Sequence, residues 1–281
     1  MKRSILSALM LSLLALTTLA QTAKKPAKTL AVGSPEWLVK EYFVDLNPPN
    51  LVPYMSIDVR TNFGDTTFGA LIPSDVVVTY RRLQSDSALK IYAVTARYGA
   101  DIRDMYCYIE RKGTAWQISA IHWMPAYDEY AGDIKAIKAI PQLNDSLQLE
   151  LKMKELTISS DSALKVHFMT HRKQFDTLAQ ITTPYKGLFL LLSRCSDSAF
   201  APEQGRVYEK VCPFMRPASV WAIFHGNADC PAGTFFEVGE QRANVVGFLY
   251  VPKGSPVPPM NEGRLYLLDK IVPNWYLYKM Y

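Results

Sequence analysis

The chain has 281 residues, of which 49% are apolar and 20% charged, with 31 lysines and arginines against 26 aspartates and glutamates. This composition is typical of a globular protein, so it excludes a chain that is disordered, collagen-like or coiled coil throughout. The charge balance is close to neutral and the basic residues are scattered. We therefore expect no nucleic-acid partner, since such proteins gather basic residues into a stripe or patch.

Residues 1–20 predict a secretory signal peptide. Lys2 and Arg3 precede an apolar run, and the segment ends at Ala20. The run is shorter than the roughly 20 apolar residues that a bilayer span needs, and no later run is longer. We therefore expect an exported bacterial protein, periplasmic or secreted, with a tail over 21–33 and no transmembrane span in the mature chain.

A helix followed by four strands is predicted in the first half of the chain. Ser34 is a favourable N-cap, and Pro35 suits the first helical position. Asn47 and the two prolines after it should end this helix. Alternating apolar and polar residues then predict strands at 75–82, 89–98, 105–111 and 115–123. A short turn at Lys112 and Gly113 makes the last two strands an antiparallel hairpin.

Both faces of these strands carry large apolar side chains, which favours a curved sheet with a helix on its concave face and partial cover on the other. Together with the sequences Tyr-Cys-Tyr-Ile-Glu at 106–110 and Gly-Thr-Ala-Trp-Gln-Ile at 113–118, this order of elements resembles the nuclear-transport-factor-like superfamily, the cystatin-like cone. The resemblance covers 34–126 and implies a cone-shaped α+β domain. Members include isomerases, dehydratases and non-catalytic modules, so the fold alone implies no function.

His122 is a possible general base, because catalytic members of that superfamily place acids and bases on the inner face of the sheet. Alternation predicts that Trp116, Ile118, Ala120 and His122 share one face. The candidate catalytic residues are His122, Asp104 and Tyr106. The candidate ligand-binding residues are Tyr98, Tyr108 and Trp116. The simpler interpretation is that these side chains fill the core.

A second α+β domain is predicted over 155–281, after a connector at 127–154 with one or two helical turns. Residues 147–157 fit either a strand or the approach to a helix. Ser160 then caps a helix with a continuous apolar stripe. The stripe residues are Leu164, Phe168, His171, Phe175 and Leu178. Strands are expected at 219–224, 235–238, 245–251, 264–268 and 275–279.

The helix pattern from Phe168 to Leu178, the strand sequence Gly-Phe-Leu-Tyr at 247–250 and the closing Trp-Tyr-Leu-Tyr at 275–278 resemble a group of small exported bacterial domains. That group has no assigned activity, so the resemblance implies a domain boundary and export only.

His167 and His171 are four residues apart, but the glutamate of a helical zinc motif is absent between them. We interpret His171 as a core histidine and His167 as a residue at the edge of the stripe.

Export allows the cysteines to form disulfides. Cys107 lies in a predicted strand of the first half, so we expect one bridge among Cys195, Cys212 and Cys230. Cys212 and Cys230 each precede a proline, which favours extended backbone in loops, although the geometry could favour Cys195 as a partner. The sequence has no paired Cys-x-x-Cys motif, and we expect no metal site and no cofactor.

Together these patterns predict an α+β protein of two domains, each a helix packed on an antiparallel sheet. The leading hypothesis is a non-catalytic module of the cell envelope that binds a small-molecule ligand or a partner protein. The alternative is a lyase or isomerase that acts on a small hydrophobic substrate with His122 as its base.

Overall fold

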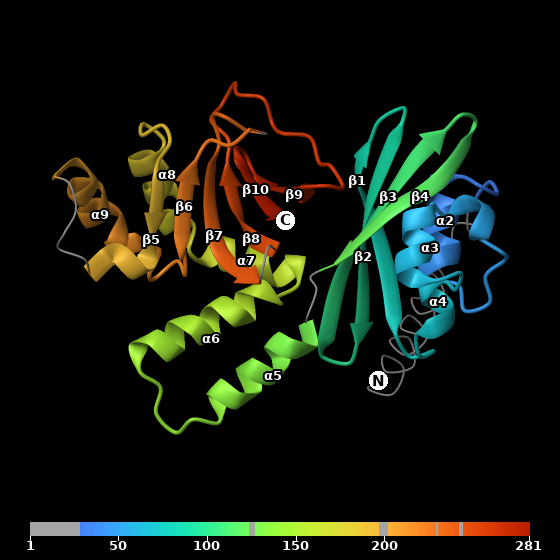
Figure 1. The fold of residues 1–281 in the computed structure, drawn as a ribbon, viewed down its shortest axis with the longest axis horizontal. Coiled ribbons are helices and arrows are strands. Elements are labelled where there is room, and N and C mark those ends of the chain that lie inside the picture. The colour runs from blue at the N-terminus through green and yellow to red at the C-terminus, as the bar shows by residue number, and fades with distance from the viewer. Residues whose placement is uncertain (1–28, 124–126, 197–201, 229, 242–243) are drawn as a thin grey trace, which may run out of the picture.

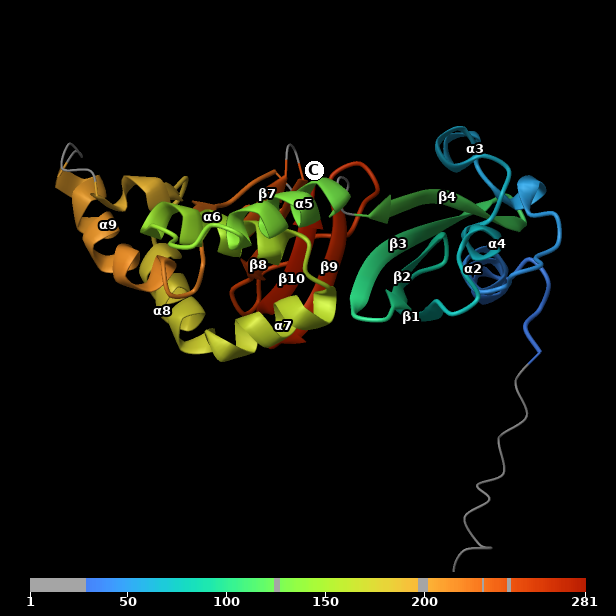
Figure 2. The same ribbon diagram turned by 90° about the horizontal axis from the view of Figure 1, so that it is seen from below.

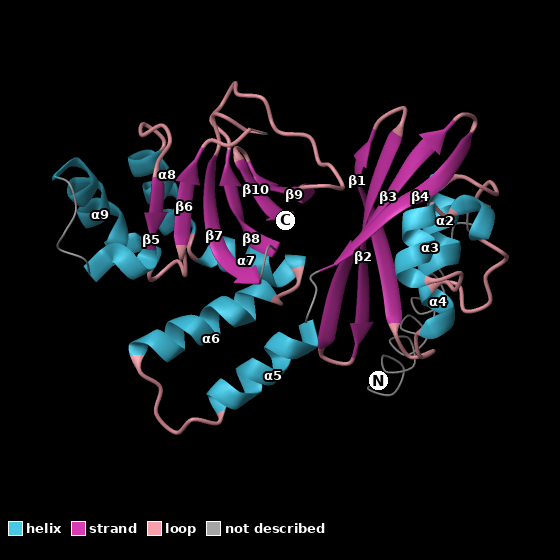
Figure 3. Ribbon diagram, in the orientation of Figure 1, coloured by secondary structure: helices cyan, strands magenta, loops and turns pink. Residues whose placement is uncertain are grey.

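The computed structural model describes residues 29–123, 127–196, 202–228, 230–241 and 244–281. The predicted signal peptide and most of the predicted tail lie outside these residues. The described chain is α+β, and its strands form two antiparallel sheets. The molecule is elongated, with the first sheet toward one end and α9 at the other (Figures 1 and 2). Figure 3 shows how helices and strands alternate along this axis.

The first sheet is an antiparallel meander in the order β1-β2-β3-β4. Its strands are β1 (Val77–Ser85), β2 (Leu89–Tyr98), β3 (Asp101–Lys112) and β4 (Ala115–Trp123). The bounds of β2 and β4 are those predicted. Gly113 has a φ of 63°, the left-handed backbone that a tight hairpin turn requires and that glycine adopts at little cost. The predicted hairpin is therefore confirmed.

Helices cover one face of this sheet (Figure 1). They are α2 (Pro35–Phe43), α3 (Ile57–Phe63) and α4 (Phe68–Leu71), with the short 3-10 helix η1 (Val52–Tyr54). The hydroxyl of Ser34 accepts a hydrogen bond from the Trp37 N–H, which confirms the predicted N-cap. However, α2 ends at Phe43, before the prolines that were expected to stop it.

Two helices, rather than one or two turns, follow the first sheet. They are α5 (Tyr127–Lys138) and α6 (Asp145–Thr157), so the predicted connector underestimated the helical content of this segment. Asn144 caps α6 by accepting a hydrogen bond from the Leu147 N–H. This settles the ambiguity at 147–157 in favour of a helix.

The predicted helix after Ser160 is two helices, α7 (Asp161–Thr170) and α8 (Arg172–Thr182). His171 has non-helical backbone angles and forms the junction between them. The break exchanges the predicted roles of the two histidines. His167 is the buried one, with Nε2 3.0 Å from the carbonyl oxygen of Ala218, whereas His171 is only half-buried.

The second sheet has the order β5-β6-β7-β8-β10-β9, and all its pairs are antiparallel. Its strands are β5 (Phe189–Leu191), β6 (Ala222–His225), β7 (Thr234–Gln241), β8 (Asn244–Tyr250), β9 (Leu265–Val272) and β10 (Trp275–Met280). The short edge strand β5 was not predicted. The other strands overlap the predicted ones.

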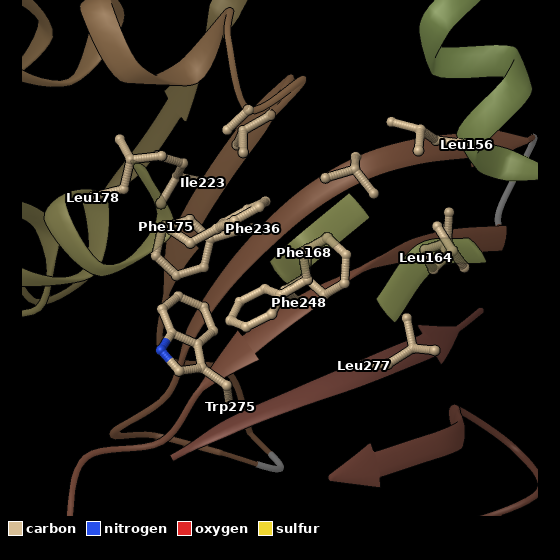
Figure 4. Close-up of a cluster of buried hydrophobic side chains, with 14 of the residues drawn as sticks. Leu156, Leu164, Phe168, Phe175, Leu178, Ile223, Phe236, Phe248, Trp275 and Leu277 are labelled. Atoms are coloured by element: carbon tan, nitrogen blue, oxygen red, sulfur yellow. The ribbon is translucent and has the colours of Figure 1, made fainter. Parts of the chain in front are cut away.

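An aromatic cluster joins α7 and α8 to the second sheet (Figure 4). Phe168 and Phe175 stack with their ring centroids 5.2 Å apart, and both contact Phe248 and Trp275. The indole Nε1 of Trp275 donates to Asp176 Oδ1 at 3.0 Å. The apolar stripe thus forms a core, as its spacing indicated, although the helix that carries it is broken.

One disulfide joins Cys195 in the 3-10 helix η2 (Leu192–Ser196) to Cys212 in α9 (Pro202–Met215). Cys107 and Cys230 are buried and take no part in this bridge. The expectation that Cys212 lies in an extended loop was wrong, because Pro213 is accommodated inside α9.

None of the described helices is long and apolar enough to cross a membrane.

Candidate functional site

A cavity of about 410 Å³ lies between the first sheet and the helices that cover it. Helices α2, α3 and α4 form one wall, and strands β2, β3 and β4 form the other. Residues at the start of α5 and just before α7 complete the lining. The lining residues are Tyr42, Phe43, Phe63, Thr66, Phe68, Leu71, Ala96, Ile102, Arg103, Asp104, Met105, Ile121, Trp123, Tyr127, Asp128 and Ile158.

The cavity is mostly apolar and aromatic. Phe43 and Met105 belong to the buried core beneath α2, whereas Leu71 and Trp123 remain 68% and 43% exposed. Large apolar side chains that are exposed beside a hollow favour binding of an apolar group there. Trp123 packs edge-to-face on Phe63, with the ring centroids 4.8 Å apart.

Charged groups of the cavity lie at its α5 side. The guanidinium of Arg103 donates from Nη2 to Asp128 Oδ1 at 2.9 Å, and it lies 4.4 Å from the centroid of the Tyr127 ring. Both partners of this ion pair are largely exposed, so its contribution to stability is small. The cation–π contact with Tyr127 nevertheless favours this position of the guanidinium.

Asp104 also lines the cavity, but its carboxylate is already hydrogen-bonded. Thr95 Oγ1 donates to Oδ1, and the backbone N–H of Asp161 donates to Oδ2 at 2.7 Å. Burial raises the pKa of Asp104, and the nearby Asp161 carboxylate adds to the increase. Asp104 therefore joins the first sheet to the N-terminus of α7, where a negative charge is favourable.

Tyr106 and His122, the other candidate catalytic residues, lie on the face of the sheet that packs on the C-terminal half, the face toward which Asp104 also turns its carboxylate. The hydroxyl of Tyr106 donates to Asp161 Oδ1 at 2.7 Å, and His122 Nδ1 is hydrogen-bonded to the hydroxyl of Tyr281 at 2.8 Å. The His122 ring stacks on Tyr266, with the centroids 5.4 Å apart. These contacts join the first sheet to the C-terminal half, so Tyr106 and His122 do not line the cavity.

A β-bulge explains the position of His122. Tyr108 pairs with Ala120 and Ile109 with Ile118, so Ser119 is an extra residue on β4. Ile118 therefore faces α2, whereas Ala120 and His122 face the C-terminal half. The prediction that Trp116, Ile118, Ala120 and His122 share one face was wrong because one inserted residue reverses the alternation.

The candidate ligand-binding residues also lie outside the cavity. Tyr108 is buried, and its hydroxyl donates to the carbonyl oxygen of Tyr266 at 2.9 Å. Tyr98 is 55% exposed at the end of β2. Trp116 packs beside the core under α2, with the ammonium of Lys90 5.4 Å from its ring centroid. Sequence reasoning selected aromatic residues of the strands and missed those that the helices contribute.

A second, more open hollow of about 640 Å³ lies beside the first and contains His122, Asp58, Glu262 and Tyr281 in its lining. Phe63, Ile121 and Trp123 line both hollows and so form the wall between them. Among the described residues, no group of three or more His, Cys, Asp or Glu side chains could hold a metal ion.

His122 should titrate well below the usual range of histidine, because burial lowers its pKa to about 4. A folded-state pKa below the ordinary value of 6.5 means that the unfolded chain binds the proton more readily. The contribution of His122 to the free energy of unfolding is therefore complete above about pH 6.5 and is lost as the pH falls through about 4.

The NMR shifts of the His122 ring nitrogens should show a titration midpoint near pH 4, and the signal is assigned by its loss in His122→Phe. A midpoint near 6.5 would contradict the burial of this ring.

No protein-family model, curated protein or solved structure matches this chain.

Proposed function

We propose that this chain is a non-catalytic binding protein of the bacterial cell envelope, and that its first half holds a small, largely apolar ligand. The cavity between the first sheet and α2, α3 and α4 carries this proposal. Its volume of about 410 Å³ lies within the range of small-molecule sites, and such sites combine apolar walls with a few placed polar groups.

Binding is favoured over catalysis because the groups expected to perform acid–base chemistry are occupied elsewhere. The carboxylate of Asp104 accepts hydrogen bonds from Thr95 and from the Asp161 N–H. His122, the expected base of a lyase or isomerase, is stacked on Tyr266 outside the cavity. A general base must reach the proton it removes, and His122 does not line this cavity.

The same proposal includes export and a division into two domains. The Cys195–Cys212 bridge fits a protein of an oxidising compartment, and residues 1–20 have the pattern of a signal peptide. Each half has its own antiparallel sheet. The first would be the cone-shaped domain over 34–126, and the second the α+β domain over 155–281.

The cavity should bind N-phenylnaphthylamine, a neutral probe whose fluorescence rises in apolar surroundings. Ala96 lines the cavity from β2, and Ala96→Phe would place a ring in the space that the probe needs. We expect this variant to lower the probe affinity by about tenfold or more in a fluorescence titration. Circular dichroism of the same samples would check that the variant remains folded.

Val77→Phe is the matched control, because Val77 is 60% exposed on β1 of the same sheet and does not line the cavity. It adds a phenyl ring to the sheet without filling the cavity, so it should bind the probe as the parent does. A folded Ala96→Phe protein that binds as tightly as the control would contradict the proposed site.

A further inference from the structure

Among the described residues that line the cavity, Arg103 is the single basic one. Its guanidinium lies over the Tyr127 ring, 4.4 Å from the centroid, and donates a hydrogen bond to the carboxylate of Asp128. A guanidinium has five N–H groups in a planar fork that matches a carboxylate. The structure thus shows a carboxylate bound to a positioned cation beside an apolar hollow.

We infer that the ligand of this cavity is an amphiphile with an apolar body and an anionic head, a carboxylate in the simplest case, which binds Arg103 in place of Asp128. This inference rests on the proposed function and specifies the chemistry of its ligand. The apolar body contacts the aromatic walls, and the head remains at the α5 side where Arg103 lies.

The exchange is favourable because the internal pair is weak. The side chain of Asp128 is 84% exposed and that of Arg103 is 52% exposed, and exposed pairs of this kind contribute little to stability. A ligand that is already anchored by its apolar body brings its carboxylate to Arg103 at a high effective concentration. Asp128 can then return to solvent at little cost.

Asp104 is the other acidic residue in the described lining of the cavity, and it repels an anionic head group only weakly. Both carboxylate oxygens of Asp104 accept hydrogen bonds, from Thr95 and from the first N–H of α7. Burial and the nearby Asp161 carboxylate raise the pKa of Asp104, which disfavours its charged form. Its carboxylate is directed toward α7, whereas Arg103 faces Asp128 and Tyr127.

Three probes with the same alkyl chain and different heads test the inference on the full chain. They are decanoate, decanol and decyltrimethylammonium, each used below its critical micelle concentration to displace N-phenylnaphthylamine. We expect decanoate to bind about tenfold more tightly than decanol, and decyltrimethylammonium to bind no more tightly than decanol. Arg103→Gln should abolish the preference for decanoate and leave decanol binding unchanged.

Asp128→Asn removes the competing carboxylate, so it should strengthen decanoate binding severalfold without changing decanol binding. Arg97→Gln is the matched control, since it removes the same side-chain charge from an exposed position on the neighbouring strand β2, outside the cavity. It should leave the preference intact.

The results separate the two proposals. If decanol displaces the probe and Ala96→Phe prevents this displacement, the cavity binds apolar ligands. This conclusion does not depend on the effect of Arg103→Gln. A decanoate preference that survives Arg103→Gln, or a preference for the cationic probe, would overturn the anionic head alone. Failure of every probe to bind would overturn the proposed function itself.

Discussion

Replacing Lys279 with methionine should lower the free energy of unfolding by about 3–5 kcal/mol, the cost of leaving a buried charge without its partner. The side chain of Lys279 is 4% exposed, and its Nζ lies 3.0 Å from Asp161 Oδ1. Methionine has a similar length and is apolar, so the variant changes the charge more than the packing. Urea unfolding followed by circular dichroism measures the effect.

The effect should be large because Lys279 is the cation of a buried network that joins three parts of the molecule. Asp161 at the start of α7 accepts from the Tyr106 hydroxyl of β3, and its own N–H donates to Asp104. Lys279 on β10 lies 5.3 Å from the centroid of the Tyr106 ring. Without this cation, two neighbouring carboxylates remain in a poorly hydrated site.

Two further variants distinguish the loss of the cation from a general loss of packing. Lys270→Met, at an exposed position on the adjacent strand β9, should change stability by no more than about 0.5 kcal/mol. Adding Asp161→Asn to Lys279→Met should restore part of the lost stability, because it removes an unpaired charge. Equal effects of Lys279→Met and Lys270→Met would contradict a buried ion pair.

The regular elements of the first half could be predicted because their signals are local. The N-cap at Ser34 and the strands β2 and β4 depend on capping chemistry and on alternation within a few residues. The faces of β4 could not be predicted in the same way. The bulge at Ser119 depends on how β4 pairs with β3, and alternation within one strand contains no information about that pairing.

The missed helix α9 shows how tertiary context can override a local signal. Pro213 follows Cys212, and a residue before proline disfavours helical backbone, so an extended loop was expected. In the structure, Pro213 lies near the C-terminal end of α9, and Cys212 is bonded to Cys195 of η2. Packing of α9 against the rest of the C-terminal half therefore outweighs a preference that acts on one residue.

The location of the candidate site was less predictable than the fold, because each side of the first sheet packs on different elements. Tyr106 and Tyr108 share a buried cluster with the C-terminal half, whereas Cys107 and Ile109 pack under α2. The sequence indicated that both faces are apolar, but not which one encloses a cavity. Phe43, Phe63 and Phe68 form much of the cavity wall, and they come from helices of which only α2 was predicted.

Glu237→Gln should stabilise the protein at alkaline pH by up to about 3 kcal/mol and have little effect in acid. Glu237 on β7 is 8% exposed, and burial raises its pKa from 4.5 to about 7, with a smaller contribution from Glu240. The adjacent β8 residue is Gly247, over which the Tyr278 ring lies, and the buried Tyr278 hydroxyl has no hydrogen-bond partner among the described residues. No described cation forms an ion pair with this carboxylate.

The pH range follows from the two protonation equilibria. Below about pH 4.5, Glu237 is protonated in both the folded and the unfolded chain, so its ionisation does not lower the free energy of unfolding. Between about 4.5 and 7 the unfolded chain releases the proton while the folded chain keeps it, and the free energy of unfolding falls as the pH rises. Above about pH 7, the folded chain contains a buried ionised carboxylate, and the free energy of unfolding is lowered by the full amount. The neutral amide of glutamine does not cause this loss.

Urea unfolding of the parent and Glu237→Gln proteins at a series of pH values between about 4 and 8 measures this difference. Glu262→Gln is the control, because Glu262 is exposed and the same substitution there should give two parallel stability curves. The curves of the parent and Glu237→Gln should instead meet in acid and separate as the pH rises. Curves that stay parallel would show that Glu237 ionises in the folded protein as it does in the unfolded chain, with its carboxylate hydrated rather than buried in the second sheet.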